Sequence, residues 1–313
     1  MTRTFSFRPA RRDELPVATR VYIRADDELD LRLYGRSRRE PAAPGADETS
    51  AALDDLLLLH GDGPDRVWVA LRGDEVIGVA AAAIRERHWH LVYLFVLPEA
   101  QGQGVGRHLL ARIHATGVAA GCDIFTLQPS GDPKALTMYL KLGLTPRPPS
   151  IDLRAATPAF PPLQWDDGLN AQPLMADDPA TLATLGDIDR VVRGVRRPAD
   201  LRRWLGEGAV GALVTRRDTE APAGYYLVTH GRIGPVAAMD GERFPAVLAR
   251  SLAAAGSLGA TRVAWRIDVP GENRAALAPL FAAGFRPHRL SNLFASDPIG
   301  RWDRYIFHDE DLL

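Results

Sequence analysis

Residues 94–110 read Leu-Phe-Val-Leu-Pro-Glu-Ala-Gln-Gly-Gln-Gly-Val-Gly-Arg-His-Leu-Leu, and this stretch decides the fold. The apolar run at 91–97 predicts a strand, which Pro98 ends because proline has no N–H to donate to a neighbouring strand. A short loop follows in which every second residue is glycine, at Gly102, Gly104 and Gly106. The stretch therefore predicts a strand, a glycine-rich turn and a helix start in direct succession.

The helix that follows this loop has apolar residues spaced by three or four, as one buried face requires. That face consists of Val105, Leu109, Ile113 and Gly117, with Leu110 beside it. The first turn of a helix has unpaired N–H groups at the positive end of its dipole, and glycine lets an anion approach them closely. The sequence therefore predicts a site for a phosphate or diphosphate.

The spacing of the glycines separates the known phosphate loops. A Walker loop needs Lys-Ser or Lys-Thr where Arg107-His108 stand, and the Rossmann pattern G-x-G-x-x-G is not met. Gln101 to Gly106 does fit the pattern Q/R-x-x-G-x-G/A. In this the chain resembles the GNAT superfamily of N-acetyltransferases, whose members wrap this loop around the diphosphate of acyl-coenzyme A (acyl-CoA).

Composition sets broad limits. The chain has 313 residues, of which 46% are hydrophobic and 25% charged, so it is long enough for two globular domains. A net charge of -1 argues against a nucleic-acid partner. A single cysteine, Cys122, allows no intrachain disulfide, and no apolar span is long enough to cross a membrane. The protein is expected in the cytoplasm, with no metal, nucleic acid or membrane as partner.

Period and turn signals predict the elements of the first half in chain order. They are a strand at 4–8, a helix at 12–29, a helix from the Thr49-Ser50 cap to 60, strands at 67–71, 76–84 and 89–97, a helix at 104–120, a strand at 124–127, a helix at 133–142 and a strand at 150–153. The order β-α-α-β-β-β-α-β-α-β is the GNAT order.

The second half repeats the first at an offset close to 140. Residues 234–241 echo the central strand and its loop, and residues 273–285 echo 132–144. We therefore expect an α/β (α+β) fold of two tandem GNAT-like domains, each a mixed, mostly antiparallel twisted sheet flanked by helices. The predicted division is a domain at 1–155, a proline-rich linker at 156–173 and a second domain at 174–313.

The two copies differ at the cofactor loop. Aligning Asp240-Gly241 with Gln101-Gly102 puts Arg243 and Pro245 where Gly104 and Gly106 stand. Proline removes an N–H donor and arginine crowds the space for a diphosphate. Leu280 takes the position that Tyr139 has in the first copy. The second copy is therefore predicted to be degenerate.

The resemblance assigns roles to residues of the first copy. Residues 135–144, Ala-Leu-Thr-Met-Tyr-Leu-Lys-Leu-Gly-Leu, are similar to the family's A-x-x-x-Y-x-x-x-G-F, which makes Tyr139 the expected general acid at the thioester sulfur. The family's Asn at the head of this motif is Asp132 here, which cannot donate a hydrogen bond when ionised. Expected cofactor-binding residues are Phe95, Val96, Leu97, Gln101, Gly102, Gln103, Gly104, Val105, Gly106, Arg107 and Asp132.

The general base is less clearly marked. His90 stands on the central strand where some family members carry a glutamate base, and a neutral imidazole accepts a proton near neutral pH. Simple alternation gives His90 a strand face with Val92 and Leu94, so a hydrogen-bonded core histidine is an equal alternative. Glu86 or a chain of water molecules is a further candidate.

These features predict an acetyl-CoA-dependent N-acetyltransferase that acts on a primary amine of a small molecule or peptide, as a monomer or homodimer. The alternative is a non-catalytic acyl-CoA sensor or interaction protein. A tandem enzyme of the mycothiol synthase type keeps its active copy second, whereas the intact copy here is first. The acceptor amine is not predicted, because its pocket is expected in loops around residues 25–60 and between the domains.

Overall fold

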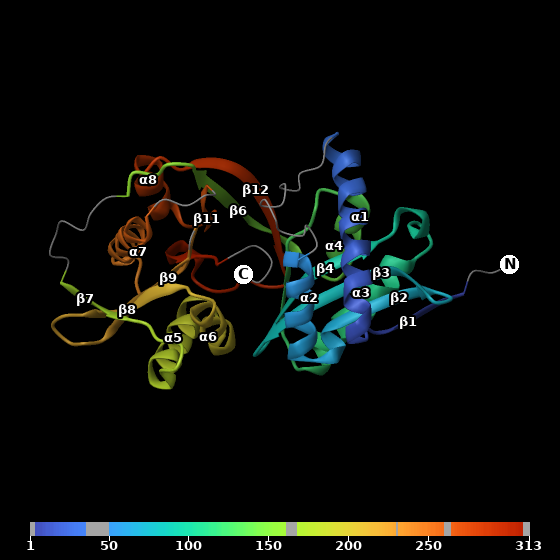
Figure 1. Cartoon of the computed structure of the whole chain (residues 1–313), viewed down its shortest axis with the longest axis horizontal. Coiled ribbons are helices and arrows are strands. Elements are labelled where there is room, and N and C mark those ends of the chain that lie inside the picture. The colour runs from blue at the N-terminus through green and yellow to red at the C-terminus, as the bar shows by residue number, and fades with distance from the viewer. Residues whose placement is uncertain (1–3, 36–49, 161–167, 230, 260–263, 309–313) are drawn as a thin grey trace. The chain divides into compact units, whose positions relative to one another are not determined.

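The computed structural model describes residues 4–35, 50–160, 168–229, 231–259 and 264–308 (Figure 1). The chain divides at Thr145 into two compact units, residues 1–145 and 146–313. No helix in the described ranges is long and apolar enough to span a membrane.

Unit 1 contains the predicted elements in the predicted order. They are β1 (Phe5–Pro9), α1 (Leu15–Tyr34), α2 (Ser50–Asp62), β2 (Val67–Arg72), β3 (Glu75–Arg85), β4 (His88–Val96), α3 (Val105–Ala119), β5 (Ile124–Leu127) and α4 (Pro133–Lys141). Thr49, the expected start of α2, lies outside the described residues. The sheet has the order β1-β2-β3-β4-β5, antiparallel except for the parallel pair β4 and β5. The predicted mixed, mostly antiparallel fold is confirmed.

Helices cover both faces of this sheet (Figure 1). On one face Trp89 of β4 is fully buried against α3, where its indole Nε1 donates to the carbonyl of Ile113 at 3.0 Å. On the other face Tyr22 of α1 packs on the rings of Tyr93 and Phe95, with ring centroids 4.8 and 4.7 Å apart. The central strand β4 is therefore held from both sides.

A β-bulge at Val92 corrects the predicted alternation of β4. Leu91 lies opposite Ala82 of β3 and Tyr93 lies opposite Ala81, so Val92 is an extra residue. The bulge places His90 on the α1 face together with Tyr93 and Phe95, and not with Leu94 as simple alternation predicts. The buried polar and aromatic side chains of β4 are thus collected on one face.

Unit 2 is built around a second sheet (Figure 1). Its elements are β6 (Thr145–Ala155), β7 (Leu169–Pro173), α5 (Pro179–Val192), α6 (Pro198–Gly206), β8 (Val210–Arg216), β9 (Pro222–Thr229), β10 (Arg232–Ala238), α7 (Phe244–Leu258), β11 (Trp265–Pro270), α8 (Arg274–Ala282), β12 (Arg286–Ala295) and β13 (Tyr305–Ile306). Within the unit the strand order is β12-β6-β11-β10-β9-β8-β7, and β13 pairs with β10.

The domain boundaries differ from the predicted ones at two strands. Strand β6 was expected to complete the first sheet, but it pairs antiparallel with β11 from Ser150 to Ala155 and so belongs to unit 2. Strand β7 lies in the predicted linker and pairs with β8. Only Leu169 of β7 is buried, so this strand has no apolar alternation by which it could be recognised.

One face of the second sheet packs on α7 and α8, and the other carries α5. The apolar core under α7 includes Leu153 of β6, Ile267 of β11 and Phe244 of α7, all fully buried. On the other face Tyr225 of β9 donates a hydrogen bond of 2.5 Å to Asp189 of α5. Unit 2 thus repeats the layered plan of unit 1.

The seating of α3 on β4 gives a test of stability. A Cβ on Gly117 would lie 2.5 Å from Cδ1 of the buried Trp89. Overpacking costs about 1–3 kcal/mol, which outweighs the gain of up to about 1 kcal/mol from alanine in a helix. Gly117→Ala is therefore expected to lower the free energy of unfolding by about 1–2 kcal/mol, measured by urea denaturation.

Gly61 of α2 is the matched control, because nothing lies within 4 Å of its Cβ position. Gly61→Ala is expected to be neutral or to stabilise by up to about 1 kcal/mol. A Gly117→Ala protein as stable as the wild type would contradict the packing of α3 on Trp89.

Candidate functional site

The glycine loop leaves the N-terminus of α3 open. The first backbone hydrogen bond of the helix runs from His108 N to Gly104 O at 3.1 Å, so the N–H groups of the preceding turn have no partner within the helix. Gly104 is the N-cap residue, and no side chain caps the helix there. The positive end of the helix dipole therefore faces the loop without an internal anion.

The three glycines have different environments. Gly102 and Gly104 have φ angles of 73° and 85°, the left-handed region that favours glycine. Nothing lies within 4 Å of a Cβ on Gly102, whereas a Cβ on Gly106 would face Val96 Cγ2 at 3.7 Å and Met138 Cε at 4.0 Å. Gly102 and Gly104 thus shape the open side of the loop, while Gly106 brings the helix close to β4 and α4.

Two glutamines hold the loop in place. Gln101 Nε2 donates to the carbonyl of Val96 at 3.0 Å, and Gln103 Nε2 donates to the carbonyl of Glu99 at 3.0 Å. The side chain of Arg107 is exposed on the first turn of α3. The residues predicted from 101 to 107 therefore lie together at one end of the sheet.

Strands β4 and β5 diverge beside this loop. Their parallel pairing runs from His88 and Ile124 to Leu91 and Leu127, where β5 ends. Strand β4 continues to Val96 and remains paired only with β3 there. The backbone of Phe95 and Val96 thus reaches the glycine loop along a side of β4 that β5 does not cover.

Tyr139 is buried on α4 next to the residue that contacts Gly106. Its side chain is 6% exposed, and within the described residues its hydroxyl makes no hydrogen bond. Burial raises the pKa of Tyr139 strongly, and the negative charge of Asp132 adds to the effect. The phenol therefore stays protonated at neutral pH and keeps a proton that it can donate.

Asp132 has a structural role in this structure. Its Oδ1 accepts the backbone N–H of Lys134 at 3.0 Å and so caps α4, and its Oδ2 accepts from Arg32 Nη2 at 2.9 Å. Burial alone would raise the pKa of Asp132, but the bonds from Arg32 and Lys134 lower it below the usual value. Both oxygens of this ionised carboxylate are thus engaged by the protein.

His90 belongs to a buried polar group on the α1 face of β4. Its Nδ1 lies 2.8 Å from Thr126 Oγ1 on β5, and His88 Nε2 lies 2.6 Å from the same oxygen. A hydroxyl has one proton, so it can donate to only one of the two imidazoles, and the other must donate to it. The tautomers of His88 and His90 are therefore coupled through Thr126.

Further residues on this face were not identified from the sequence. Tyr93 donates its hydroxyl proton to Asp55 Oδ2 of α2 at 2.8 Å, and Tyr22 of α1 packs against Tyr93 and Phe95. These side chains come from three elements, and only the bulge at Val92 aligns Tyr93 with His90. No single stretch of sequence contains this signal.

The two remaining candidates lie elsewhere. Glu86 is exposed in the turn between β3 and β4, at the opposite end of β4 from the glycine loop. Cys122 is buried just before β5, as expected for a small core residue, and burial raises the pKa of its thiol. Part of the predicted acceptor region, residues 36–49, lies outside the described residues.

Comparison with known proteins bears on this geometry. Residues 31–144 match the model of the acetyltransferase (GNAT) family. Unit 1 carries a GNAT domain. No curated protein matches the chain. The match covers α1 from Leu31, the glycine loop and Tyr139, and it ends one residue before the boundary of unit 1.

Solved structures extend the GNAT fold to the whole chain. A putative acetyltransferase from Pyrococcus horikoshii has 18% identity and a TM-score of 0.68, covering 97% of this chain and 94% of that chain. A GCN5-related N-acetyltransferase from Sphaerobacter thermophilus has 19% identity and a TM-score of 0.57, covering 93% and 95%. A tandem GNAT protein from the clavulanic acid biosynthesis pathway has 17% identity and a TM-score of 0.55, covering 94% and 99%. The chain thus has the fold of a tandem GNAT protein.

The second unit has the GNAT layout but different residues at the corresponding place. Leu280 matches Tyr139 in geometry, because each carbonyl accepts the backbone N–H five residues later, at 3.0 Å from Phe285 and 3.2 Å from Leu144. Leu280 is fully buried and has no hydroxyl. The side chain that offers a proton in unit 1 is thus replaced by a core residue.

Proposed function

We propose that unit 1 is an acetyl-CoA-dependent N-acetyltransferase that acetylates a primary amine of a small molecule or peptide in the cytoplasm, by direct attack and without a metal. One observation carries the proposal: an uncapped glycine N-terminus on α3 lies beside the unpaired end of β4 and the protonated Tyr139. These are a cradle for phosphate, a path for an extended ligand and an acid in one place.

The cradle fits a diphosphate. A Cβ would fill the open side of the loop at Gly102 and Gly104, and none is present. The N–H groups of Val105, Gly106 and Arg107 would bind the diphosphate oxygens, with the exposed guanidinium of Arg107 supplying charge. Asp132 would contribute little directly, since both its oxygens are already engaged.

The backbone of β4 would hold the rest of the ligand. An extended chain that enters where β5 ends can pair with the free side of Phe95, Val96 and Leu97, as an added strand does. Bound acetyl-CoA supplies an acyl thioester whose carbon an amine attacks, displacing a thiolate. Backbone N–H groups at this position would stabilise the negative charge on the carbonyl oxygen.

Proton transfer at the two ends is assigned to His90 and Tyr139. Neutral His90 would accept the proton lost by the amine, and Thr126 would fix the tautomer that leaves Nε2 free to accept it. Tyr139 would donate its hydroxyl proton to the leaving sulfur and regain one from water afterwards. The rings of Tyr22, Tyr93 and Phe95 would line the acceptor side.

The loop is tested by two glycine substitutions. Gly104→Val is expected to weaken acetyl-CoA binding at least about tenfold in calorimetry, because φ is positive there and a branched Cβ intrudes on the cradle. Gly106→Ala is the control, with a Cβ in ordinary contact with Val96 and Met138 and an affinity close to that of the wild type. Unchanged affinity in a folded Gly104→Val protein would remove the diphosphate from this loop.

The acid is tested by Tyr139→Phe. The change removes only the hydroxyl, so kcat is expected to fall about ten- to a thousandfold with little change in the Kd of acetyl-CoA. Because burial raises the pKa of Tyr139, wild-type kcat should not fall as the pH rises to about 10, the ordinary value for a phenol. The assay is coenzyme A release across a panel of amines, and binding without turnover on every amine would favour the acyl-CoA sensor.

The base is tested by comparing two substitutions. His90→Gln keeps a hydrogen-bonding side chain beside Thr126 and removes the basic nitrogen, so kcat/KM is expected to fall about a hundredfold or more at neutral pH. Glu86→Gln, in the exposed turn, is expected to keep wild-type activity. A loss with Glu86→Gln alone would move the role to Glu86, and two active variants would indicate a water chain.

A further inference from the structure

In unit 2 the divergence of the two central strands is filled by the chain itself. Strands β10 and β11 pair in parallel only at Arg232 and Arg266. Strand β13 then pairs antiparallel with β10, Tyr305 lying opposite Ala237 and Ile306 opposite Val236. On the other side Phe307 N donates to Asp268 O of β11 at 3.0 Å. Residues 302–308, called here the C-terminal segment, thus bridge both strands.

Gly234 of β10 is adapted to this contact. Its φ is 144°, and a Cβ there would collide with the carbonyl oxygen of Phe307. Any side chain at this position would expel the C-terminal segment or distort β10. The strand is therefore shaped to accept the segment closely.

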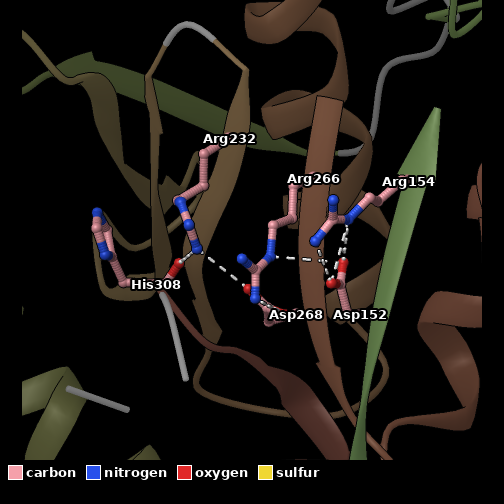
Figure 2. A network of polar contacts seen from close by, with 6 residues as sticks. All are labelled: Asp152, Arg154, Arg232, Arg266, Asp268 and His308. Carbon is pink, nitrogen blue, oxygen red and sulfur yellow. Dashed lines mark hydrogen bonds and ion pairs between the residues drawn. The ribbon is translucent and has the colours of Figure 1, made fainter. Parts of the chain in front are cut away.

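Polar contacts fix the end of the segment, as Figure 2 shows. Arg232 Nη1 donates to Asp268 Oδ2 at 3.1 Å and to the carbonyl of His308 at 2.7 Å. The carboxylate of Asp268 is 1% exposed and also pairs with Arg266 at 3.2 Å. A charge-assisted network that joins β10 and β11 thus holds the backbone of the segment.

The buried side chains of α6 and α8 add further contacts. Asn273 begins α8 in the place of Asp132, and its Nδ2 donates to the carbonyl of Tyr305 at 2.9 Å. The hydroxyl of Tyr305 accepts from Arg197, which is buried and bonded to Asp189. The imidazole of His308 stacks on Trp204 with ring centroids 3.9 Å apart. The segment is therefore bound along its whole length.

The start of α7 is also neutralised internally. Asp240 accepts the backbone N–H of Arg243 at 2.8 Å, and its other oxygen binds the Arg243 guanidinium at 2.6 Å. Asp303 of the C-terminal segment lies next to the same loop, with Oδ2 3.8 Å from the Cβ position of Gly241. Carboxylates of the chain thus occupy the region where unit 1 leaves its helix N-terminus open.

We propose that residues 302–308 are a built-in occupant of the second unit's cofactor cleft and permanently take the place of the ligand's extended arm. The comparison with that arm rests on the function proposed for unit 1. The segment supplies the strand pairing, and Asp240 and Asp303 supply the negative charge. The chain therefore takes up one acetyl-CoA, in unit 1, and the segment is not displaced by it.

The test is hydrogen exchange, read by mass spectrometry on the full chain. In the wild type the amides of 302–308 are expected to be protected, equally so with and without saturating acetyl-CoA. Gly234→Ala should speed their exchange at least about tenfold, whereas Gly241→Ala, with 3.8 Å of room, should not. Calorimetry should give one acetyl-CoA per chain in the wild type and in Gly241→Ala.

A second variant covers misfolding. If Gly234→Ala also deprotects β8 and β9, Arg232→Gln decides, because it removes the bonds to His308 and Asp268 and should speed exchange in 302–308 alone. Unprotected amides at 302–308 in the wild type, no effect of Arg232→Gln, or a second acetyl-CoA that deprotects the segment would each overturn the proposal. No binding at all would contradict the function of unit 1, while the exchange results would still decide this inference.

Discussion

The divergence of β4 from β5 after Leu91 and Leu127 is the constraint on which the candidate site depends. Backbone groups need hydrogen-bond partners, and a strand that loses its neighbour inside a fold must find others. Gln101 reaches back to the carbonyl of Val96 and satisfies one of them. The rest of this edge faces the glycine loop and Tyr139. A ligand with an extended polar arm can complete the hydrogen bonding that the sheet leaves open, which ties cofactor binding to the architecture itself.

In unit 2 the same constraint is met from within the chain. The edge of β10 is paired by Tyr305 and Ile306, and Asp268 of β11 accepts the N–H of Phe307. This solution needs a close backbone approach at Gly234 and a network that includes Arg232 (Figure 2). An empty cleft would leave these groups without protein partners, at a cost of about 1–3 kcal/mol for each buried group. Filling it makes the second unit independent of a ligand.

Much of the fold and part of the site could be predicted from the sequence, for physical reasons. Strand β5 and helix α4 follow local periods and turn residues, so their starts and types were predicted at Ile124 and Pro133. The bulge at Val92 could not be, because it depends on pairing with β3. Nor could the place of β6, since its apolar alternation fits either sheet and its partner β11 lies far along the chain. Tyr93 and Asp55 meet only after those pairings form.

The loss of the site in unit 2 involves linked changes and not a single substitution. Asp240 caps the start of α7 and binds Arg243, so the anion position and its cation are both used internally. Leu280 removes the buried hydroxyl, and Asn273, which keeps the amide that Asp132 lacks, gives its N–H to Tyr305. Each contact that a ligand would need is thus made by the protein. Because such contacts support one another, restoring one glycine or one tyrosine would leave the C-terminal segment in place, and cofactor binding in this unit would not return.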